Sequence, residues 1–240
     1  MKTIKIVFKS FLILIALLVP ILGSMAGNEE GGYIGQQGEG HPTVAYNFLK
    51  HFNYEDYYWD RDWCYGSSNN SLVDNMDMVL FAGHGNQWLV GCEDGSTAQF
   101  SSIGGTSNKG WGNRDLEFIA FESCKVVPRP CDRSDGNWYS RWTQNDGVMD
   151  GVHQILGFGT DSYQSTDQDV SDYFGDRVSR GYGVWESWFD AINAEARSIE
   201  KGSAVMYPPC DGDTYYSFSA DPPEGHTWLR IWYQTGNCLN

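Results

Sequence analysis

The sequence predicts an α/β protein organised as a sandwich around a mostly parallel sheet, and two observations carry this prediction. The runs 77–83 (DMVLFAG) and 116–121 (LEFIAF) are almost continuously apolar, which is typical of strands buried on both faces. Two later segments, 167–180 and 184–201, instead repeat apolar residues every three to four positions, which predicts helices. Strands that alternate with helices are typical of parallel sheets covered by helices.

The chain before the first strong strand predicts one more helix. Residues 41–52 place Val44, Phe48 and Phe52 at helical spacing, with Pro42 near the start. The preceding segment, 27–40, is rich in Gly, Glu and Gln, and we expect it to be flexible. The α/β domain is therefore expected to span 41–240.

The rest of the chain supplies shorter strands and long loops. Strands are expected at 89–90, 155–158, 203–207 and 228–233, and loops at 53–75, 101–113 and 125–146. The loop at 53–75 has room for one short strand.

The first 26 residues have the layout of a secretory signal peptide. Lys2, Lys5 and Lys9 form a basic start, and an apolar run follows from Phe11 to Leu22. The small residues before Gly27 predict cleavage after Ala26. The apolar run of about a dozen residues is short for a membrane span of about 20. We therefore expect a secreted or extracytoplasmic protein that is not membrane-bound after cleavage.

The charge of the chain narrows the classes of partner. The whole chain has 31 acidic and 16 basic residues and a net charge of −15. Residues 27–240 carry a net charge of −18, because the first 26 residues hold three lysines and no acid. Such acidity argues against nucleic acid and anionic lipid as partners, since both attract clustered Lys and Arg.

Two residues with catalytic chemistry follow the two buried strands. The first run continues into Gly83-His84-Gly85, and the second into Glu122-Ser123-Cys124. Active groups in open α/β sheets gather beyond the carboxyl ends of the strands. If these strands are neighbours, His84 can act as a base toward a nucleophilic Cys124. The amide N–H groups of Gly85 and Cys124 would then stabilise an oxyanion.

These two blocks, MVLFAGHGN and LEFIAFESC, resemble the caspase–hemoglobinase clan of cysteine peptidases, which includes caspases, legumain, clostripain, gingipains and separase. The resemblance is strong over 77–124 and weaker through 155–158 and the two following helices. It implies a three-layer α/β/α sandwich, a His84–Cys124 dyad, Gly85 as an oxyanion contributor and a peptide or protein substrate. It implies no cofactor and no metal. Glu122 departs from the clan's pattern, and an acid beside the thiol would raise the pKa of Cys124.

The six cysteines leave other roles open. With Cys124 as the nucleophile, five remain, so two disulfides can form and one thiol is left over. Cys64 with Cys92 and Cys210 with Cys238 are candidate pairs by region, although sequence does not fix connectivity. A zinc site is an alternative, from soft ligands at His84, Cys92, Cys124 and Cys131, but CxxC and HxxxH spacings are absent. For calcium, the acids at 167–172 and 211–213 lack EF-hand spacing, and we interpret them as solvated surface or, for Asp167, a helix cap.

A second class of function is a catalytically inactive exported binding module. In that case Cys124 is half of a disulfide, and a tryptophan-rich surface binds a ligand such as carbohydrate. The tryptophans in predicted loops are the candidates for such a surface: Trp59, Trp63, Trp111, Trp138 and Trp142. His153 lies in an apolar stretch and is interpreted as a packed histidine. For peptidase activity, the acidity of the chain favours a basic residue before the cleaved bond.

Overall fold

A computed structural model of the whole chain describes residues 28–52, 56–58, 73–92, 95–103, 111–143 and 148–238. The predicted signal peptide and its cleavage site lie outside these residues.

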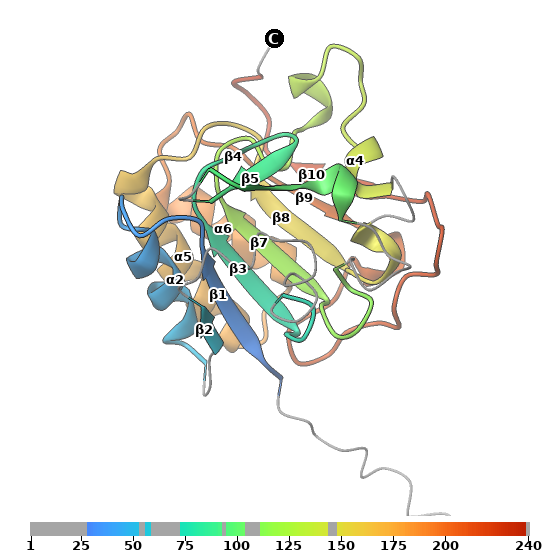
Figure 1. Cartoon of the computed structure of the whole chain (residues 1–240), viewed down its shortest axis with the longest axis horizontal. Helices are drawn as coiled ribbons and strands as arrows, with labels where there is room; N and C mark the ends of the chain where they lie inside the picture. Colours follow the sequence, from blue (N-terminus) through green and yellow to red (C-terminus); the bar gives the residue numbers. More distant parts are fainter. Residues whose placement is uncertain are drawn as a thin grey trace, which may run out of the picture.

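The central layer is a seven-stranded sheet in the order β10-β9-β8-β7-β3-β1-β2 (Figure 1). β9 is antiparallel to both of its neighbours, and the other pairs are parallel. The predicted α/β class with a mostly parallel sheet is therefore confirmed. The strand bounds are Glu30–Ile34 (β1), Asp56–Tyr58 (β2), Met78–Ala82 (β3), Phe118–Glu122 (β7), Gln154–Phe158 (β8), Gly202–Met206 (β9) and Arg230–Tyr233 (β10).

The inner strands are buried on both faces, as their continuous apolar runs predict. In β3, Val79 and Phe81 join one core, whereas Met78 and Leu80 join the other. β7 and β8 alternate in the same way, because successive side chains of a strand point to opposite faces. Two cores on opposite sides of one sheet give the molecule its three layers.

β1 corrects the expectation that 27–40 is flexible. This strand lies between β3 and β2 and is fully buried. Its glycines, which read as a loop signal, are required by close packing. A Cβ on Gly31 would lie 2.6 Å from the Tyr33 ring, and one on Gly32 would lie 2.8 Å from Leu49. The domain therefore begins at least ten residues before the predicted boundary at 41.

Three helices cover one face of the sheet: α2 (His41–Leu49), α5 (Gln164–Ser179) and α6 (Val184–Glu195). Their apolar stripes pack on the sheet through residues such as Phe48, Phe174 and Trp188. α6 ends six residues before the predicted end at 201, because Ala196 adopts an extended conformation. The segment after Ala196 returns to the sheet at Glu200, which is 1% exposed.

The opposite face carries no long helix among the described residues. It is covered by a small antiparallel sheet of β4 (Gly85–Asn86), β5 (Leu89–Gly91) and β6 (Thr97–Gln99), and by the short helix α4 (Ser140–Thr143). Phe100, Trp111 and Trp142 fill the space beneath them and are fully buried. Single 3₁₀ turns form at Phe100–Ser102, Pro130–Asp132, Val148–Asp150 and Pro208–Cys210.

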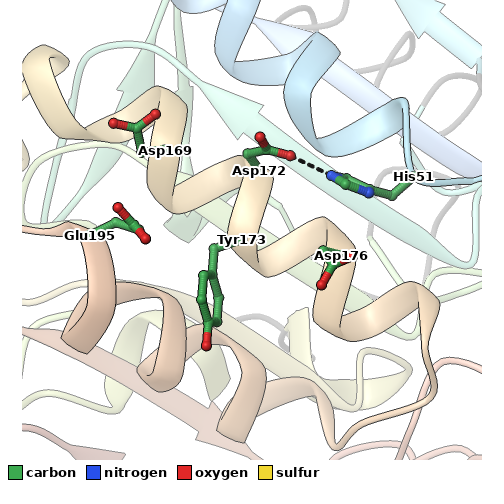
Figure 2. Close-up of a pocket in the computed structure, with 6 residues that line it drawn as sticks. All are labelled: His51, Asp169, Asp172, Tyr173, Asp176 and Glu195. Carbon is green, nitrogen blue, oxygen red and sulfur yellow. Dashed lines mark hydrogen bonds and ion pairs between the residues drawn. The ribbon is translucent and has the colours of Figure 1, made fainter.

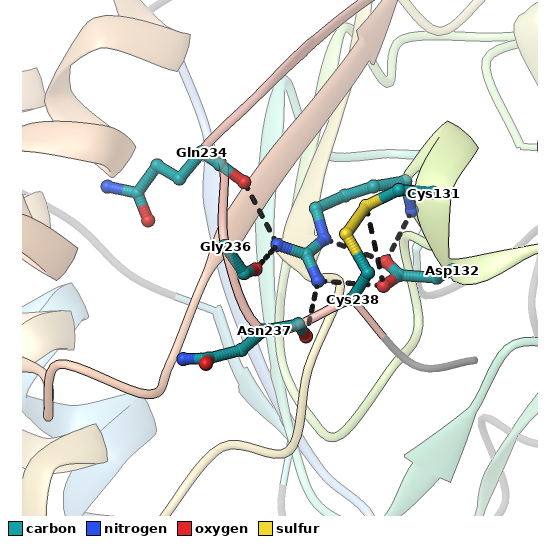
Figure 3. The surroundings of a disulfide bond; sticks show 7 residues. Cys131, Asp132, Gln234, Gly236, Asn237 and Cys238 are labelled. Atoms are coloured by element: carbon teal, nitrogen blue, oxygen red, sulfur yellow. Dashed lines mark hydrogen bonds and ion pairs between the residues drawn. A yellow bond between two sulfur atoms is a disulfide. The ribbon is translucent and has the colours of Figure 1, made fainter.

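The C-terminal segment is held against the loop after β7 (Figure 3). A disulfide joins Cys131 to Cys238. Beside it, the buried Arg129 guanidinium pairs with Asp132 and donates to the carbonyl oxygens of residues 234, 236 and 237. The candidate pair Cys210–Cys238 is therefore wrong, and Cys210 is a buried free thiol.

Cys92 is disulfide-bonded, but the candidate pair Cys64–Cys92 lies partly outside the described residues. Within the described ranges, no helix combines the length and the apolar character that a membrane span requires.

Candidate functional site

The register of two neighbouring strands brings the predicted dyad residues to one edge of the sheet. β3 and β7 are parallel neighbours, and Ala82 is paired with Glu122. His84 follows Ala82 by two residues, and Cys124 follows Glu122 by two residues. Both side chains line one pocket of about 420 Å³. The structure therefore places the predicted base and nucleophile in a shared pocket, as the strand-end argument requires.

The remaining walls of this pocket come from three places in the chain. The loop before α2 contributes Glu39, and the first residue of α2 is His41. The loop and first turn of α5 contribute 162–165 and Asp167. Arg197 projects from the segment after α6. The early end of α6 thus forms part of the pocket wall.

Cys124 is a free, half-buried thiol. Its Sγ donates to the Ser162 carbonyl oxygen at 3.6 Å. Burial raises the pKa of the Cys124 thiol, contacts with Ser162 partly offset this rise, and Asp161 and Asp167 add to it. The resting thiol is therefore protonated at neutral pH, and it needs a base to become a nucleophile. Because Cys124 is not in a disulfide, the interpretation of Cys124 as a disulfide half is wrong.

His84 is open to solvent, with 63% of its side chain exposed. Its Nε2 lies 3.3 Å from Glu39 Oε2, and its ring meets the His41 ring edge-on at 5.8 Å between centroids. Burial and the neighbouring His84 lower the pKa of His41. Both dyad residues are described, and no hydrogen bond joins His84 to Cys124 in this arrangement.

Gly85 is held by close packing against the residue before the thiol. A Cβ on Gly85 would lie 2.4 Å from Ser123 Oγ and 2.7 Å from Val126. Gly85 pairs with Val90, and the His84 carbonyl oxygen accepts from the Gly91 N–H at 2.9 Å. In this register Gly85 belongs to a non-hydrogen-bonded pair, so its own N–H points away from β5. That N–H is therefore not used by the β4–β5 ladder.

A group of buried acids adjoins the pocket. The sequence pointed to two of its members in other roles, Glu122 as an acid beside the thiol and Asp167 as a helix cap. Glu122, Asp167 and Glu200 are at most 4% exposed. Burial raises the pKa of Asp167 to about 7, and Glu200 adds to the rise. Burial, Asp167 and Glu200 raise the pKa of Glu122 well above its usual range.

These acids correct two expectations. Asp167 is neither a solvated residue nor the cap of its helix, because α5 starts three residues earlier and its N-cap is Tyr163. The acids that raise the thiol pKa are Asp161 and Asp167, whereas Glu122 was expected to do so. A Glu122 carboxyl kept neutral by burial exerts little electrostatic force on the thiol.

A second thiol–imidazole pair lies at the opposite edge of the sheet. His153 and Cys210 are fully buried, and His153 Nδ1 is 2.8 Å from Asp213 Oδ2. Burial and Asp213 raise the pKa of Cys210 far above its usual range. A substrate has no access to this pair, and His153 is a packed histidine as predicted.

The alternative zinc and tryptophan sites do not form as predicted. Cys92 and Cys131 are in disulfides and cannot act as thiolate ligands. Trp111 and Trp142 are fully buried in the core, so they do not line a cleft. Trp138 packs partly buried against the same core, and Trp59 and Trp63 lie outside the described residues.

Another hollow, of about 360 Å³, lies on the helical layer (Figure 2). Figure 2 shows Asp169 of α5 facing Glu195 of α6, with Asp172 turned toward His51, to which it is bonded. Lys50 and Arg180 also form ion pairs with acids of α5. This surface has no nucleophile, and Tyr173 is its largest apolar group. It therefore lacks the chemistry of the strand-end pocket.

The chain matches one family model and is distantly similar to two solved structures. A family model described as a domain of unknown function, DUF6345, matches residues 24–221. Among solved structures, the chain is similar to the Arg-specific cysteine proteinase gingipain R at 13% identity and a TM-score of 0.47. The match covers 70% of this chain and 42% of that one.

A complex of the Porphyromonas gingivalis RgpB pro- and mature domains matches at 13% identity and a TM-score of 0.45, over 69% of this chain and 43% of that one. The chain thus spans less than half of the structures that it matches. A search of curated proteins gave no match.

Proposed function

This chain belongs to the DUF6345 family, and we propose that it is an exported cysteine endopeptidase that uses Cys124 and His84. One observation carries the proposal: a free thiol and an open imidazole line one pocket from register-matched ends of neighbouring strands. Dyads of this kind need a base within reach of the thiol and a cleft that admits the substrate. The substrate in this proposal is a peptide or protein.

The reaction begins when His84 turns from Glu39 and takes the thiol proton. The Cys124 sulfur attacks the peptide carbonyl, and a bond forms between sulfur and carbon. The carbonyl oxygen gains the negative charge, and the N–H groups of Gly85 and Cys124 stabilise it. His84 then gives its proton to the leaving amine as the C–N bond breaks. Water, deprotonated by His84, hydrolyses the thioester and restores the thiol.

In the resting state of this cycle, the Cys124 thiol donates a hydrogen bond to the Ser162 carbonyl oxygen. Burial keeps the thiol neutral, so the proton moves only when the imidazole arrives. Such a site has low intrinsic reactivity, which protects an exported thiol from oxidation, because the thiolate is the reactive form.

The same pocket supports a preference for a basic side chain before the cleaved bond. Asp167 lines the pocket, and its Oδ1 is buried without a hydrogen-bond partner. Glu39, with its side chain 46% exposed, adds a second carboxylate at the rim. An Arg or Lys side chain would supply the missing donors and the counter-charge. We therefore expect Arg or Lys peptides to be cleaved in preference to Asn or Asp peptides.

The test is hydrolysis of fluorogenic peptides with Arg, Lys, Asn or Asp before the scissile bond. Cys124→Ala and His84→Ala are each expected to reduce kcat/KM at least 10³-fold, whereas Cys210→Ala, which removes the buried thiol, should retain activity. Asp167→Asn is expected to lower the ratio of Arg to Asn cleavage. Unchanged cleavage by Cys124→Ala would assign the activity to another site.

A labelling experiment addresses the nucleophile independently of the substrate. Iodoacetamide added to the folded, unreduced protein should modify Cys124 and leave Cys210 unmodified, because Cys210 is fully buried. Modification of Cys210 alone would contradict the assignment. Export is tested by N-terminal sequencing of the protein from the culture medium, which should begin at Gly27.

A further inference from the structure

Three acids meet at the edge of the sheet opposite the Cys124 pocket. Asp77 immediately precedes β3, and Glu117 immediately precedes β7. The pairing of Met78 with Phe118 places Asp77 and Glu117 side by side, just before the two strands. Asp115 lies two residues earlier in the chain. One carboxylate oxygen from each residue lies within 4.8 Å of the other two.

These carboxylates lack a counter-charge. Glu117 is 8% exposed, and its Oε2 is buried without a hydrogen-bond partner. No Lys, Arg or His of the described ranges forms an ion pair with Asp77, Asp115 or Glu117. Asp77 Oδ2 accepts from the Glu29 N–H at 2.6 Å, which is a neutral donor. A buried, unpaired carboxylate beside two others is costly, since like charges repel strongly where water is excluded.

The titration of the acids reflects this crowding. Burial raises the pKa of Glu117 to about 9, with Asp77, Asp115 and Asp221 adding to the rise. Burial also raises the pKa of Asp77 to about 6. Asp221, which is exposed, faces the same group and lies 3.7 Å from His153 Nε2. Asp77, Asp115 and Glu117 therefore repel one another when they are charged, and none of them pairs with a basic side chain of the described residues.

We propose that Asp77, Asp115 and Glu117 bind a hard divalent cation, with Ca²⁺ as the best fit. Carboxylate oxygens are the ligands of hard cations, and Ca²⁺ accepts them at about 2.3–2.6 Å. Oxygens on opposite sides of Ca²⁺ are then separated by roughly 5 Å, which accommodates the observed spacing. The exposed Asp115 leaves the outer side of the cation open to water. The ligand set has no thiol or imidazole, so it does not favour Zn²⁺.

A cation at this position would act on the stability of the sheet. It would link the first residues of two central strands and remove the repulsion between their carboxylates. This role uses neither Cys124 nor His84, so it stands apart from the proposed peptidase activity.

Thermal unfolding of the full mature chain tests the proposal. After dialysis against EDTA, the protein is melted without metal and with 10 mM CaCl2 or MgCl2. We expect Ca²⁺ to raise Tm by several degrees, and Mg²⁺ to raise it less. Glu117→Gln and Asp77→Asn should fold without metal, since each replaces an acid with a neutral amide of nearly the same shape, and each should lose most of the Ca²⁺ shift.

The matched control is a double variant in the acidic hollow of Figure 2, Asp169→Asn with Asp176→Asn. It removes two acids from another cluster and should keep the full Ca²⁺ response. Calorimetric titration of the wild type with CaCl2 should give one site that Glu117→Gln lacks. A wild-type Tm that CaCl2 does not change, or an equal shift in Glu117→Gln, would overturn the proposal.

Discussion

The buried pair Arg129–Asp132 should contribute strongly to the stability of the C-terminal segment. All five N–H donors of the guanidinium are engaged: two with Asp132 at 2.7 Å, and three with backbone carbonyl oxygens of 234–237 at 2.7–2.9 Å. Both side chains are at most 1% exposed. Asp132→Ala removes the counter-charge and leaves a buried cation. Breaking a buried pair in this way costs about 3–5 kcal/mol.

Urea unfolding under oxidising conditions measures this loss with the Cys131–Cys238 disulfide intact. Thermal unfolding should show the same loss. For a domain of about 200 residues, each kcal/mol corresponds to about 2–4 °C in Tm, so we expect the Tm of Asp132→Ala to fall by roughly 6–20 °C. Asp132→Asn keeps the shape and one acceptor, and it should lose less. The matched control is Asp135→Ala, which breaks the ion pair of Arg133 with the exposed Asp135 and should change little.

A loss below about 1 kcal/mol for Asp132→Ala would refute the reasoning. It would mean that water enters and solvates the guanidinium once the carboxylate is removed. An equal loss in Asp135→Ala would also contradict it, because the effect would then not depend on burial.

Three further predictions follow from the packing and charge of other residues. Gly85→Ala should cost about 1–3 kcal/mol in urea unfolding, because its Cβ would meet Ser123 Oγ at 2.4 Å, whereas Gly212→Ala has free space and should not. Cys131→Ser opens a disulfide whose cysteines are 107 positions apart; loop-closure entropy predicts a loss of about 4–5 kcal/mol, and retention of wild-type stability would contradict it. Asp167→Asn should stabilise the fold at pH 8 by up to about 4 kcal/mol and have little effect at pH 3. The reason is that the pKa of Asp167 is raised from 3.8 to about 7, so the folded state loses stability as pH rises through that window. Equal gains at both pH values would rule out ionisation as the cause.

The sequence was sufficient to predict the elements whose pattern is local. The apolar runs of β3 and β7 and the stripes of α5 and α6 each carry their own signal, and all four elements form, although α6 ends six residues before its predicted end. β1 was missed because Glu30, Gly31 and Gly32 have the composition of a loop. Glycine is required at 31 and 32 because Tyr33 and Leu49 occupy the space that a Cβ would need in the folded state. The local sequence of a five-residue strand does not reveal a packing contact with a residue far along the chain.

The disulfide pairing of the cysteines likewise depends on contacts between distant parts of the chain. Cys131 and Cys238 form a disulfide where the C-terminal segment lies against the loop after β7. Arg129 of that loop donates to three carbonyl oxygens of the segment. Proximity along the chain instead suggested Cys210 for Cys238. Disulfide connectivity follows from how loops are held in three dimensions, and sequence separation alone does not decide it.

For the candidate site, too, the sequence predicts some features and the fold alone determines others. His84 and Cys124 could be placed together because a parallel register carries two strand ends to one edge. The chemical state of the thiol could not be predicted, since it depends first on burial, then on hydrogen bonds with Ser162, and last on Asp161 and Asp167, all more than 35 residues further along the chain. Glu122 is adjacent in sequence, yet burial beneath α5 and beside Glu200 favours its neutral form and removes its influence. The positions of His84 and Cys124 after two buried strands thus predict that both line one pocket, whereas their environment depends on burial and on residues that only the fold brings near.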